Sequence, residues 1–267
     1  VLFQFNDLFG ANGIDKRMGS SLSDIYYIDL FSFVSFPSLR LLLIVGLLFS
    51  IALIIGYLPF YLILINTIIY SSLITKSYVM FNYQWDIFLI EASLISLLFI
   101  SPKLTSVRNL ISYRLYLLQV IPYLLLIIRL FVHSGLVKIF SNDPHWVTNT
   151  ALSVHFYSQP LPHLFSYYAH SFLVRNNLIV TATQLMFIIE CLVPFGLLVY
   201  SFRSVSALIL IIFQLTIVLT GNYGFFNFLI IALLIPLFFF KASDQVNGSL
   251  KRSDLFMYVT YVPILLF

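Results

Sequence analysis

The sequence contains very few charged residues. Asp, Glu, Lys and Arg make up 9% of the 267 residues, whereas a soluble domain carries about 25%. So few charges cannot cover a water-facing surface, and 61% of the chain is hydrophobic, so lipid must replace water around much of the molecule. The net charge of +4 is spread over many loops and forms no basic stripe, so nucleic-acid binding has no support.

Cysteine and the common catalytic motifs are also scarce or absent. Cys191 is the one cysteine, so these residues form no internal disulfide, and its apolar surroundings predict a buried small side chain. No Walker, nucleophile-elbow, dinucleotide or zinc-protease motif occurs, and no two histidines have the spacing of a helical zinc site. The sequence therefore predicts no metal, no other cofactor and no catalytic nucleophile.

What the chain does contain is long uncharged apolar runs, which predict an all-α, polytopic helical membrane protein. Residues 41–75 carry no charge, and the GYLP break at 56–59 predicts a helical hairpin. Arg203 is predicted to mark a short turn before a second long run, 204–240, which is interrupted at 220–224 by TGNYG. The remaining predicted spans are 85–100, 115–132, 178–200 and a last one from 255 onward. Together these make about eight hydrophobic segments of spanning or near-spanning length.

One polar segment interrupts this membrane domain, which we take to be a single domain over 1–267. We predict an extramembrane or interfacial insert at 133–176. All five histidines of the chain lie there, with three of the ten prolines and one of the two tryptophans. Connecting segments carry function more often than packed elements do. The shorter loops on the other side favour a lumenal or exoplasmic position for the insert.

Six stretches of the chain match one family pattern in the same order. They are QWDIFLIE at 84–91, SGLVK at 134–138, NDPHW at 142–146, HFYSQPLP at 155–162, ECLVP at 190–194 and TGNYGFFNFL at 220–229. They resemble the signature of the lipase maturation factor family. The resemblance implies a membrane protein of the endoplasmic reticulum that assists the folding and assembly of secreted lipases.

The chain departs from that family in two of these stretches and at its ends. Tyr157 and Ser158 stand where the family has Glu and Thr, and Asn142 and His145 stand where the family's SGDPTW has Gly and Thr. The large polar C-terminal domain of the family does not follow, and the chain begins at Val1 and stops at Phe267 inside apolar runs. We therefore expect a fragment, a processed product or the ordered part of a longer protein.

Two groups of residues are candidates for function. The insert supplies the predicted client- or partner-binding residues, which are Asp143, Trp146, His155, Gln159, Pro160 and Pro162. The spans and their borders supply the predicted intramembrane polar residues, which are Glu91, Arg129, Lys138, Glu190, Asn222 and Asn227.

Glu190 gives the sharpest structural expectation. A charge at the centre of a span costs roughly 3 kcal/mol, so the carboxylate should face protein and a partner. We expect Glu190 to contact Arg129, His133 or Lys138. Such a contact is either an ion pair that locks two helices together or part of a polar site between them.

The expected function is a non-enzymatic, membrane-anchored maturation or assembly factor for a secreted or membrane client. Its partners would be membrane lipids and a lipase-like protein client, with the endoplasmic reticulum or another membrane as its location. Two alternatives remain open. One is a structural subunit of a larger membrane complex. The other is a membrane enzyme distantly related to the vitamin K-dependent carboxylases, with Lys138 and His155 as its candidate groups.

Overall fold

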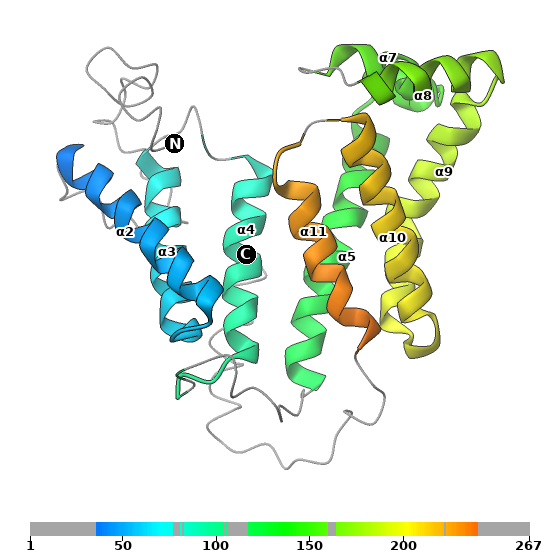
Figure 1. Cartoon of the computed structure of the whole chain (residues 1–267). Helices are drawn as coiled ribbons and strands as arrows, with labels where there is room; N and C mark the ends of the chain where they lie inside the picture. Colours follow the sequence, from blue (N-terminus) through cyan, green and yellow to red (C-terminus); the bar gives the residue numbers. More distant parts are fainter. Residues whose placement is uncertain are drawn as a thin grey trace. The chain divides into compact units, whose positions relative to one another are not determined.

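The computed structural model of the chain describes residues 36–76, 81, 83–103, 105, 117–159, 164–221 and 223–239. These residues form α-helices and short 3₁₀ helices, and among them there is no strand (Figure 1). The all-α prediction is confirmed for this part of the chain. Two compact units result, one of residues 1–115 with 251–267 and one of residues 116–250.

The first unit contains the predicted helical hairpin. Helix α2 (Phe36–Ile55) and helix α3 (Pro59–Lys76) pack against each other. The turn between them uses Gly56 at a φ of 86°, a left-handed conformation that glycine adopts without steric cost. Proline then opens α3, at the helix position where its missing N–H costs nothing.

Helix α4 (Gln84–Ser96) completes the first unit and packs on α3. Its start is fixed by Asp86, whose carboxylate accepts a hydrogen bond from the backbone N–H of Tyr83 at 3.0 Å. The same carboxylate accepts the hydroxyl of Tyr70 from α3. This buried acid therefore both caps α4 and joins it to the hairpin. A short 3₁₀ helix, η1 (Leu97–Phe99), follows.

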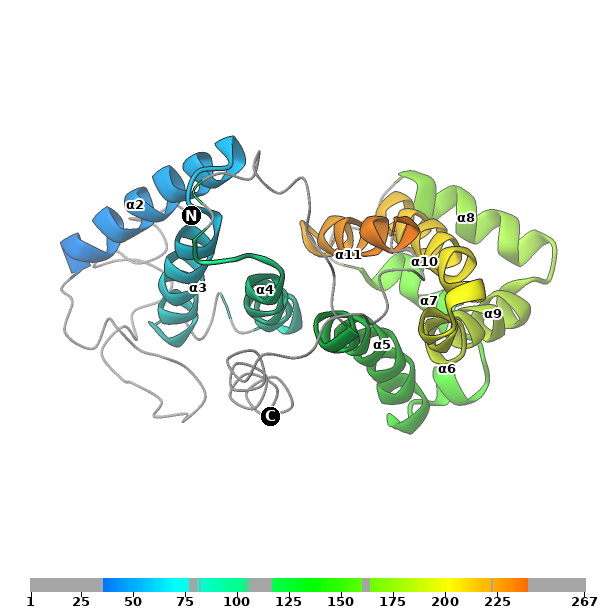
Figure 2. The same cartoon turned by 90° about the horizontal axis from the view of Figure 1, so that it is seen from below.

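The second unit is a helical bundle with a layer of short helices at one end (Figures 1 and 2). The bundle consists of α5 (Leu117–Phe140), α9 (Ile179–Cys191), α10 (Tyr200–Thr220) and α11 (Phe226–Leu234). Two 3₁₀ helices continue α9 and α11, namely η3 (Val193–Leu198) and η4 (Ile235–Phe238). The layer consists of α6 (Pro144–Val147), α7 (Ala151–Ser158) and α8 (Leu164–Arg175).

Among the described residues, three helical stretches are long and apolar enough to cross a membrane. They are Gln119–Phe140, Ile179–Leu198 and Tyr200–Thr220. Three shorter apolar helices accompany them, at Arg40–Ile55, Pro59–Ile74 and Phe226–Phe238. The helical membrane class is thus supported, but the expected eight segments are not all found. The expected last segment, from 255, lies outside the described residues.

The bounds of the insert differ from the expectation. Helix α5 continues through residues 133–140, so the part of the insert that leaves the bundle begins at Ser141. The polar side chains in 133–140 suggested an earlier exit from the membrane. Lys138 is instead accommodated inside the helix because it meets an acidic partner on α9.

Arg203 also lies elsewhere than predicted. The sequence suggested a turn there, but Arg203 is a buried residue inside α10. Its Nε donates a hydrogen bond to the carbonyl of Leu197 at 2.9 Å. Since η3 replaces the last turns of α9, its carbonyls lack the usual intrahelical donors, and the guanidinium supplies one.

Gly135 sets how closely α5 and α9 approach. A Cβ at this position would overlap the Sγ of Cys191 and lie 3.3 Å from the Cβ of Glu190. We predict that Gly135→Ala lowers the free energy of unfolding by about 1–3 kcal/mol, because the two helices must separate to admit the methyl group. Cys191→Ala in the same chain should recover much of this loss. Thermal unfolding of the purified protein in detergent measures both effects.

Gly46 in α2 is the matched control. A Cβ there meets nothing closer than 3.6 Å, which is ordinary contact. Gly46→Ala should therefore leave stability unchanged or raise it by about 0.5–1 kcal/mol, as alanine does in a helix interior. Equal effects of the two glycine substitutions would contradict the steric argument.

Candidate functional site

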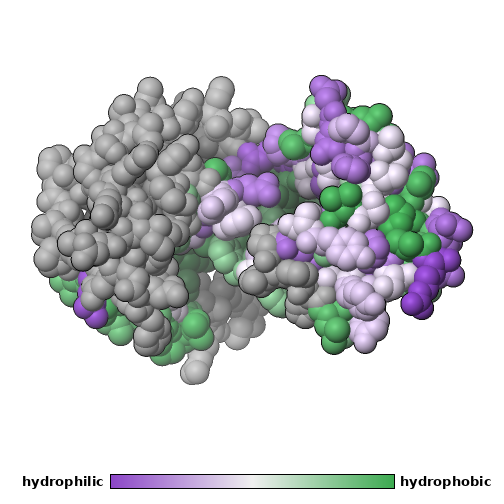
Figure 3. Space-filling model, turned by 90° about the horizontal axis from the view of Figure 1, so that it is seen from above, coloured by the Kyte–Doolittle hydropathy of each residue, from purple (hydrophilic) through white to green (hydrophobic). Residues whose placement is uncertain are grey.

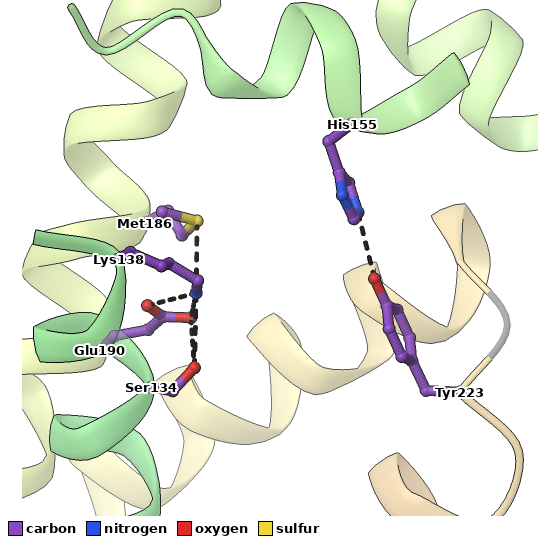
Figure 4. Close-up of polar contacts among 6 residues, drawn as sticks. All are labelled: Ser134, Lys138, His155, Met186, Glu190 and Tyr223. Carbon is purple, nitrogen blue, oxygen red and sulfur yellow. Dashed lines mark hydrogen bonds and ion pairs between the residues drawn. The ribbon is translucent and has the colours of Figure 1, made fainter. Parts of the chain in front are cut away.

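An ion pair joins α5 to α9 inside the second unit (Figure 4). The Nζ of Lys138 lies 2.6 Å from the Oε2 of Glu190 and also contacts Oε1. The Glu190 side chain is 4% exposed and the Lys138 side chain 22%. The expected contact of Glu190 with the segment 129–138 is therefore confirmed, through Lys138.

The hydroxyl of Ser134 completes this contact. It lies 3.4 Å from both the Nζ of Lys138 and the Oε1 of Glu190. Ser134 and Lys138 are four residues apart on α5, so helical geometry places them on one face. The carboxylate thus receives donors from two successive turns of the same helix.

The insert covers the ammonium group with an aromatic ring. The Nζ of Lys138 lies 5.6 Å from the ring centroid of Trp146, within the range of a cation–π interaction. The same indole packs edge-on against Phe187 of α9, with ring centroids 6.0 Å apart. The Sδ of Met186 lies 4.0 Å from Nζ (Figure 4).

The position of Trp146 follows from the local sequence. Asp143 is the N-cap of α6 and accepts a hydrogen bond from the backbone N–H of His145 at 2.8 Å. Pro144 occupies the first turn, where its fixed φ favours helix. Asn142, with a φ of 56°, makes the turn out of α5. The NDPHW stretch therefore folds into one helical turn that directs the indole onto α5 and α9.

A second set of contacts joins α7 to the connection between α10 and α11. The Nε2 of His155 lies 3.2 Å from the hydroxyl of Tyr223 (Figure 4). The Nε2 of Gln159 donates to the carbonyl of Thr220, the last residue of α10, at 2.8 Å. Two stretches that the sequence singled out separately, HFYSQPLP and TGNYG, are thus in direct contact.

Gly221 makes this contact possible. Its φ of −141° is open to any residue, so conformational freedom is not the reason for glycine here. A Cβ would instead lie 2.7 Å from the Cε2 of Tyr223 and 3.2 Å from the Oε1 of Gln159. The side chains of the insert and of the loop occupy the space that any larger residue would need.

Burial and charge together act on the imidazole of His155. Burial lowers its pKa below the ordinary histidine value, and the positive charge of Lys138 lowers the pKa further. Burial also raises the pKa of the Tyr223 hydroxyl. Because the charge of Lys138 reaches His155, the ion pair and the His155–Tyr223 pair share one electrostatic environment.

The other predicted site residues are placed as follows. Arg129 is exposed on α5, Asn227 is buried on α11, and Glu91 is half-buried on α4 of the first unit. Pro160, Pro162 and Asn222 lie outside the described residues. Of the predicted client-binding residues, Trp146, His155 and Gln159 make the internal contacts given above. Their predicted contact with a client stays a prediction.

Sequence reasoning missed three contributors, namely Ser134, Met186 and Tyr223. Ser134 lies four residues before Lys138, but this spacing carried no signal because the predicted span ended at 132, before both residues. Met186, four residues before Glu190 in the predicted span 178–200, could have been found from this spacing. Tyr223 lies within a stretch already singled out, but no sequence pattern paired it with His155.

The cluster brings together an amine, a carboxylate, an aliphatic hydroxyl, an imidazole and a phenol. These are groups that acid–base chemistry uses, and they are also groups that join helices in an apolar medium. In the part of the chain that the structure describes, no group of three or more His, Cys, Asp or Glu residues could hold a metal ion.

The fold and these contacts define a helical membrane domain whose polar insert is held onto its bundle by partly buried side-chain contacts. The family model of the lipase maturation factor transmembrane domain matches residues 1–243, so the chain belongs to the lipase maturation factor family. No solved structure matches the chain.

Curated relatives agree with this assignment. Lipase maturation factor 2 of Gallus gallus is 32% identical over 193 residues, which cover 69% of this chain and 26% of the relative. The Xenopus laevis protein of the same name is 32% identical over 238 residues, covering 84% and 32%. Lipase maturation factor 1 of Mus musculus is 27% identical over 164 residues, covering 61% and 28%. The chain thus spans between about a quarter and a third of the length of these relatives.

The ion pair gives a prediction about stability. Glu190→Ala should lower the free energy of unfolding by about 3 kcal/mol, because it leaves the ammonium of Lys138 without its carboxylate in an apolar bundle. Glu190→Gln should cost less, since an amide still accepts a hydrogen bond. The double variant Lys138→Met, Glu190→Leu should be more stable than either of its single variants. Thermal unfolding of all six proteins, wild type and the single variants Lys138→Met and Glu190→Leu included, measures the coupling, and additive effects would contradict it.

His155 gives a prediction about pH. A lowered pKa means that the folded protein binds this proton less readily than the unfolded chain does. The contribution of His155 to stability is therefore fully present above pH about 6.5 and is lost as the pH falls below that value. His155→Gln keeps a hydrogen-bonding group for Tyr223 but does not titrate. Unfolding midpoints between pH 8 and pH 5 should fall more steeply for the wild type than for this variant, and parallel curves would contradict the prediction.

Proposed function

We propose that this chain is the membrane domain of a maturation or assembly factor, and that its insert holds a protein client at the surface of the membrane. Membership of the lipase maturation factor family supports the general role. The names of the relatives, lipase maturation factors 1 and 2, point to lipases as the clients. By the same resemblance, we propose the endoplasmic reticulum membrane as the location.

This proposal rests on the side-chain contacts that hold the α6–α7 segment at both of its ends. One end is held by Trp146 over Lys138, and the other by His155 and Gln159 on the α10–α11 connection. A binding surface that is held in place before its partner arrives loses less conformational entropy on binding. The buried polar contacts thus favour a rigid platform over a loose loop.

The outward side of the same segment supplies a surface for the client. Val147, Val154 and Tyr157 are 68%, 40% and 62% exposed. Apolar side chains exposed on a segment outside the spans are typical of interaction sites. A client that is not yet folded or assembled exposes apolar residues of its own, so the two surfaces are chemically matched. Tyr157 is also one of the positions at which this chain departs from the family pattern.

The test is secretion of an active lipase. Cells that lack their own maturation factor receive a secreted lipase together with either the wild-type chain or the double variant Val147→Glu, Tyr157→Glu. The amount and the activity of the secreted lipase are measured. Two charges on the outward side should reduce the activity about tenfold or more, if each removes a contact worth 1 kcal/mol or more.

Ser201→Glu is the matched control. It adds a charge at an exposed position at the start of α10, far along the helix from the Thr220 end that meets the insert. This variant should secrete lipase as the wild type does. Secretion that does not depend on the chain at all would exclude a lipase client. Secretion that depends on the chain but tolerates the charges at 147 and 157 would exclude this surface.

A second candidate function is a membrane enzyme, favoured by one observation. Of the two groups that the sequence proposed for catalysis, Lys138 carries a positive charge that adds to the effect of burial in lowering the pKa of His155. Lys138→Arg separates the two functions because arginine keeps the positive charge but cannot serve as a base at neutral pH. Full lipase maturation with Lys138→Arg would support the non-enzymatic factor. Loss of maturation at unchanged thermal stability would support the enzyme.

A further inference from the structure

Helix α8 exposes an unusually apolar face. Its inner side packs on α7, α9 and α10, and Ser166 on that side is 1% exposed. Its outer side carries large apolar or aromatic side chains that are between 45% and 66% exposed. They are Leu164, Phe165, Tyr167, Tyr168, Phe172 and Val174. In water such an exposed apolar face would favour aggregation, so an apolar surface or solvent must cover it.

The position of α8 indicates what covers it. The helix lies across the end of the bundle rather than along it, and the view along the bundle axis shows it at the outer edge (Figures 1 and 2). With 12 residues it is about 18 Å long, too short to cross a hydrocarbon layer of about 30 Å. It is thus placed beside the spans, at one of their ends.

The outer face of α8 continues the surface that the spans turn toward lipid. The turns of α9 and α10 nearest to α8 expose Val180 at 43% and Leu219 at 51%. Farther along the same helices, Leu185 and Leu215 are 54% and 44% exposed. Figure 3 looks onto this end of the unit and shows apolar side chains among weakly and strongly polar ones. Exposed apolar side chains thus lie both on α8 and on the adjacent turns of the two spans, with exposed Arg175, Asn176 and Asn177 at the turn from α8 to α9.

We propose that α8 is an interfacial helix, whose outer face lies among the lipid headgroups and the upper parts of the acyl chains. Tyrosine and other aromatic side chains favour this layer, because the ring is apolar while a hydroxyl reaches the headgroups. Arg175 ends the helix, and its long side chain can reach lipid phosphates while its stem stays in the apolar layer.

This assignment divides the insert into two parts. Helix α8 is covered by lipid, and α6 and α7 remain the part that meets water. It also fixes the depth of the molecule, because the membrane border passes through α8 at the ends of α9 and α10. The inference does not rest on the proposed function, and its test needs no client.

The test measures the depth of spin labels. In the full chain with Cys191→Ser, single cysteines are introduced by Tyr168→Cys or Phe172→Cys and labelled with a nitroxide. The protein is placed in vesicles of mixed zwitterionic and anionic phospholipids. Accessibility to oxygen, which concentrates in the membrane, is compared with accessibility to a water-soluble nickel chelate. Ile212→Cys on α10 serves as the lipid reference and Val147→Cys on α6 as the water reference, since these side chains are 55% and 68% exposed.

The labels at 168 and 172 should lose nickel accessibility relative to the label at 147 and gain oxygen accessibility. They should also report a shallower depth than the label at 212. Two results would overturn the proposal. The first is nickel accessibility at 172 equal to that at 147. The second is protection that comes with spectral broadening at high protein-to-lipid ratio, which indicates a second copy of the chain.

Thermal unfolding of each labelled protein is recorded in parallel. If one variant unfolds, Leu164→Cys replaces it, since Leu164 lies four residues before Tyr168 on the same face and is 66% exposed. Since the three positions share one helix face but contact different lipids, agreement between any two of them decides the question.

Discussion

The pairing of Lys138 with Glu190 is the constraint on which the second unit depends. A bundle of apolar helices offers neither charge a water molecule, so each is tolerable only beside the other. Their meeting requires α5 and α9 to lie in contact at one level, and Gly135 leaves the room for it. The 38 residues between these two helices must then begin and end at the same part of the bundle, so both ends of the insert are fixed.

That loop is fixed at two places, and each place uses residues from separate parts of the sequence. Trp146 rests on Lys138 and on α9, while Gln159 and His155 bind the end of α10 and the loop after it. The stretches that carry the family resemblance are therefore mostly the two sides of internal contacts. The residues that make these contacts hold the exposed surface of the insert in position, and neighbouring residues form that surface.

The sequence predicted a structural feature correctly where one free-energy cost or one backbone constraint determined it. The hairpin followed from the Gly and Pro at 56 and 59, and the contact of Glu190 followed from the cost of an unpaired carboxylate in a span. It failed where the outcome depended on tertiary partners. Arg203 resembled a turn residue because the carbonyl that binds it is freed only by the 3₁₀ geometry of η3. The exit of the chain from α5 was placed too early because Lys138 counted as polar, although its partner makes it an interior residue.

The fit of Gly221 against Gln159 and Tyr223 also bears on how such a protein can change over generations. The side chains of Gln159 and Tyr223 fill the space that a side chain at 221 would need, although 61 residues separate Gln159 from Thr220. A larger residue at 221 is admissible only if 159 or 223 becomes smaller, and a shorter side chain at 159 gives up the donor that the end of α10 uses. Substitutions in this part of the insert and in the α10–α11 connection are therefore coupled, and we expect them to occur together during evolution.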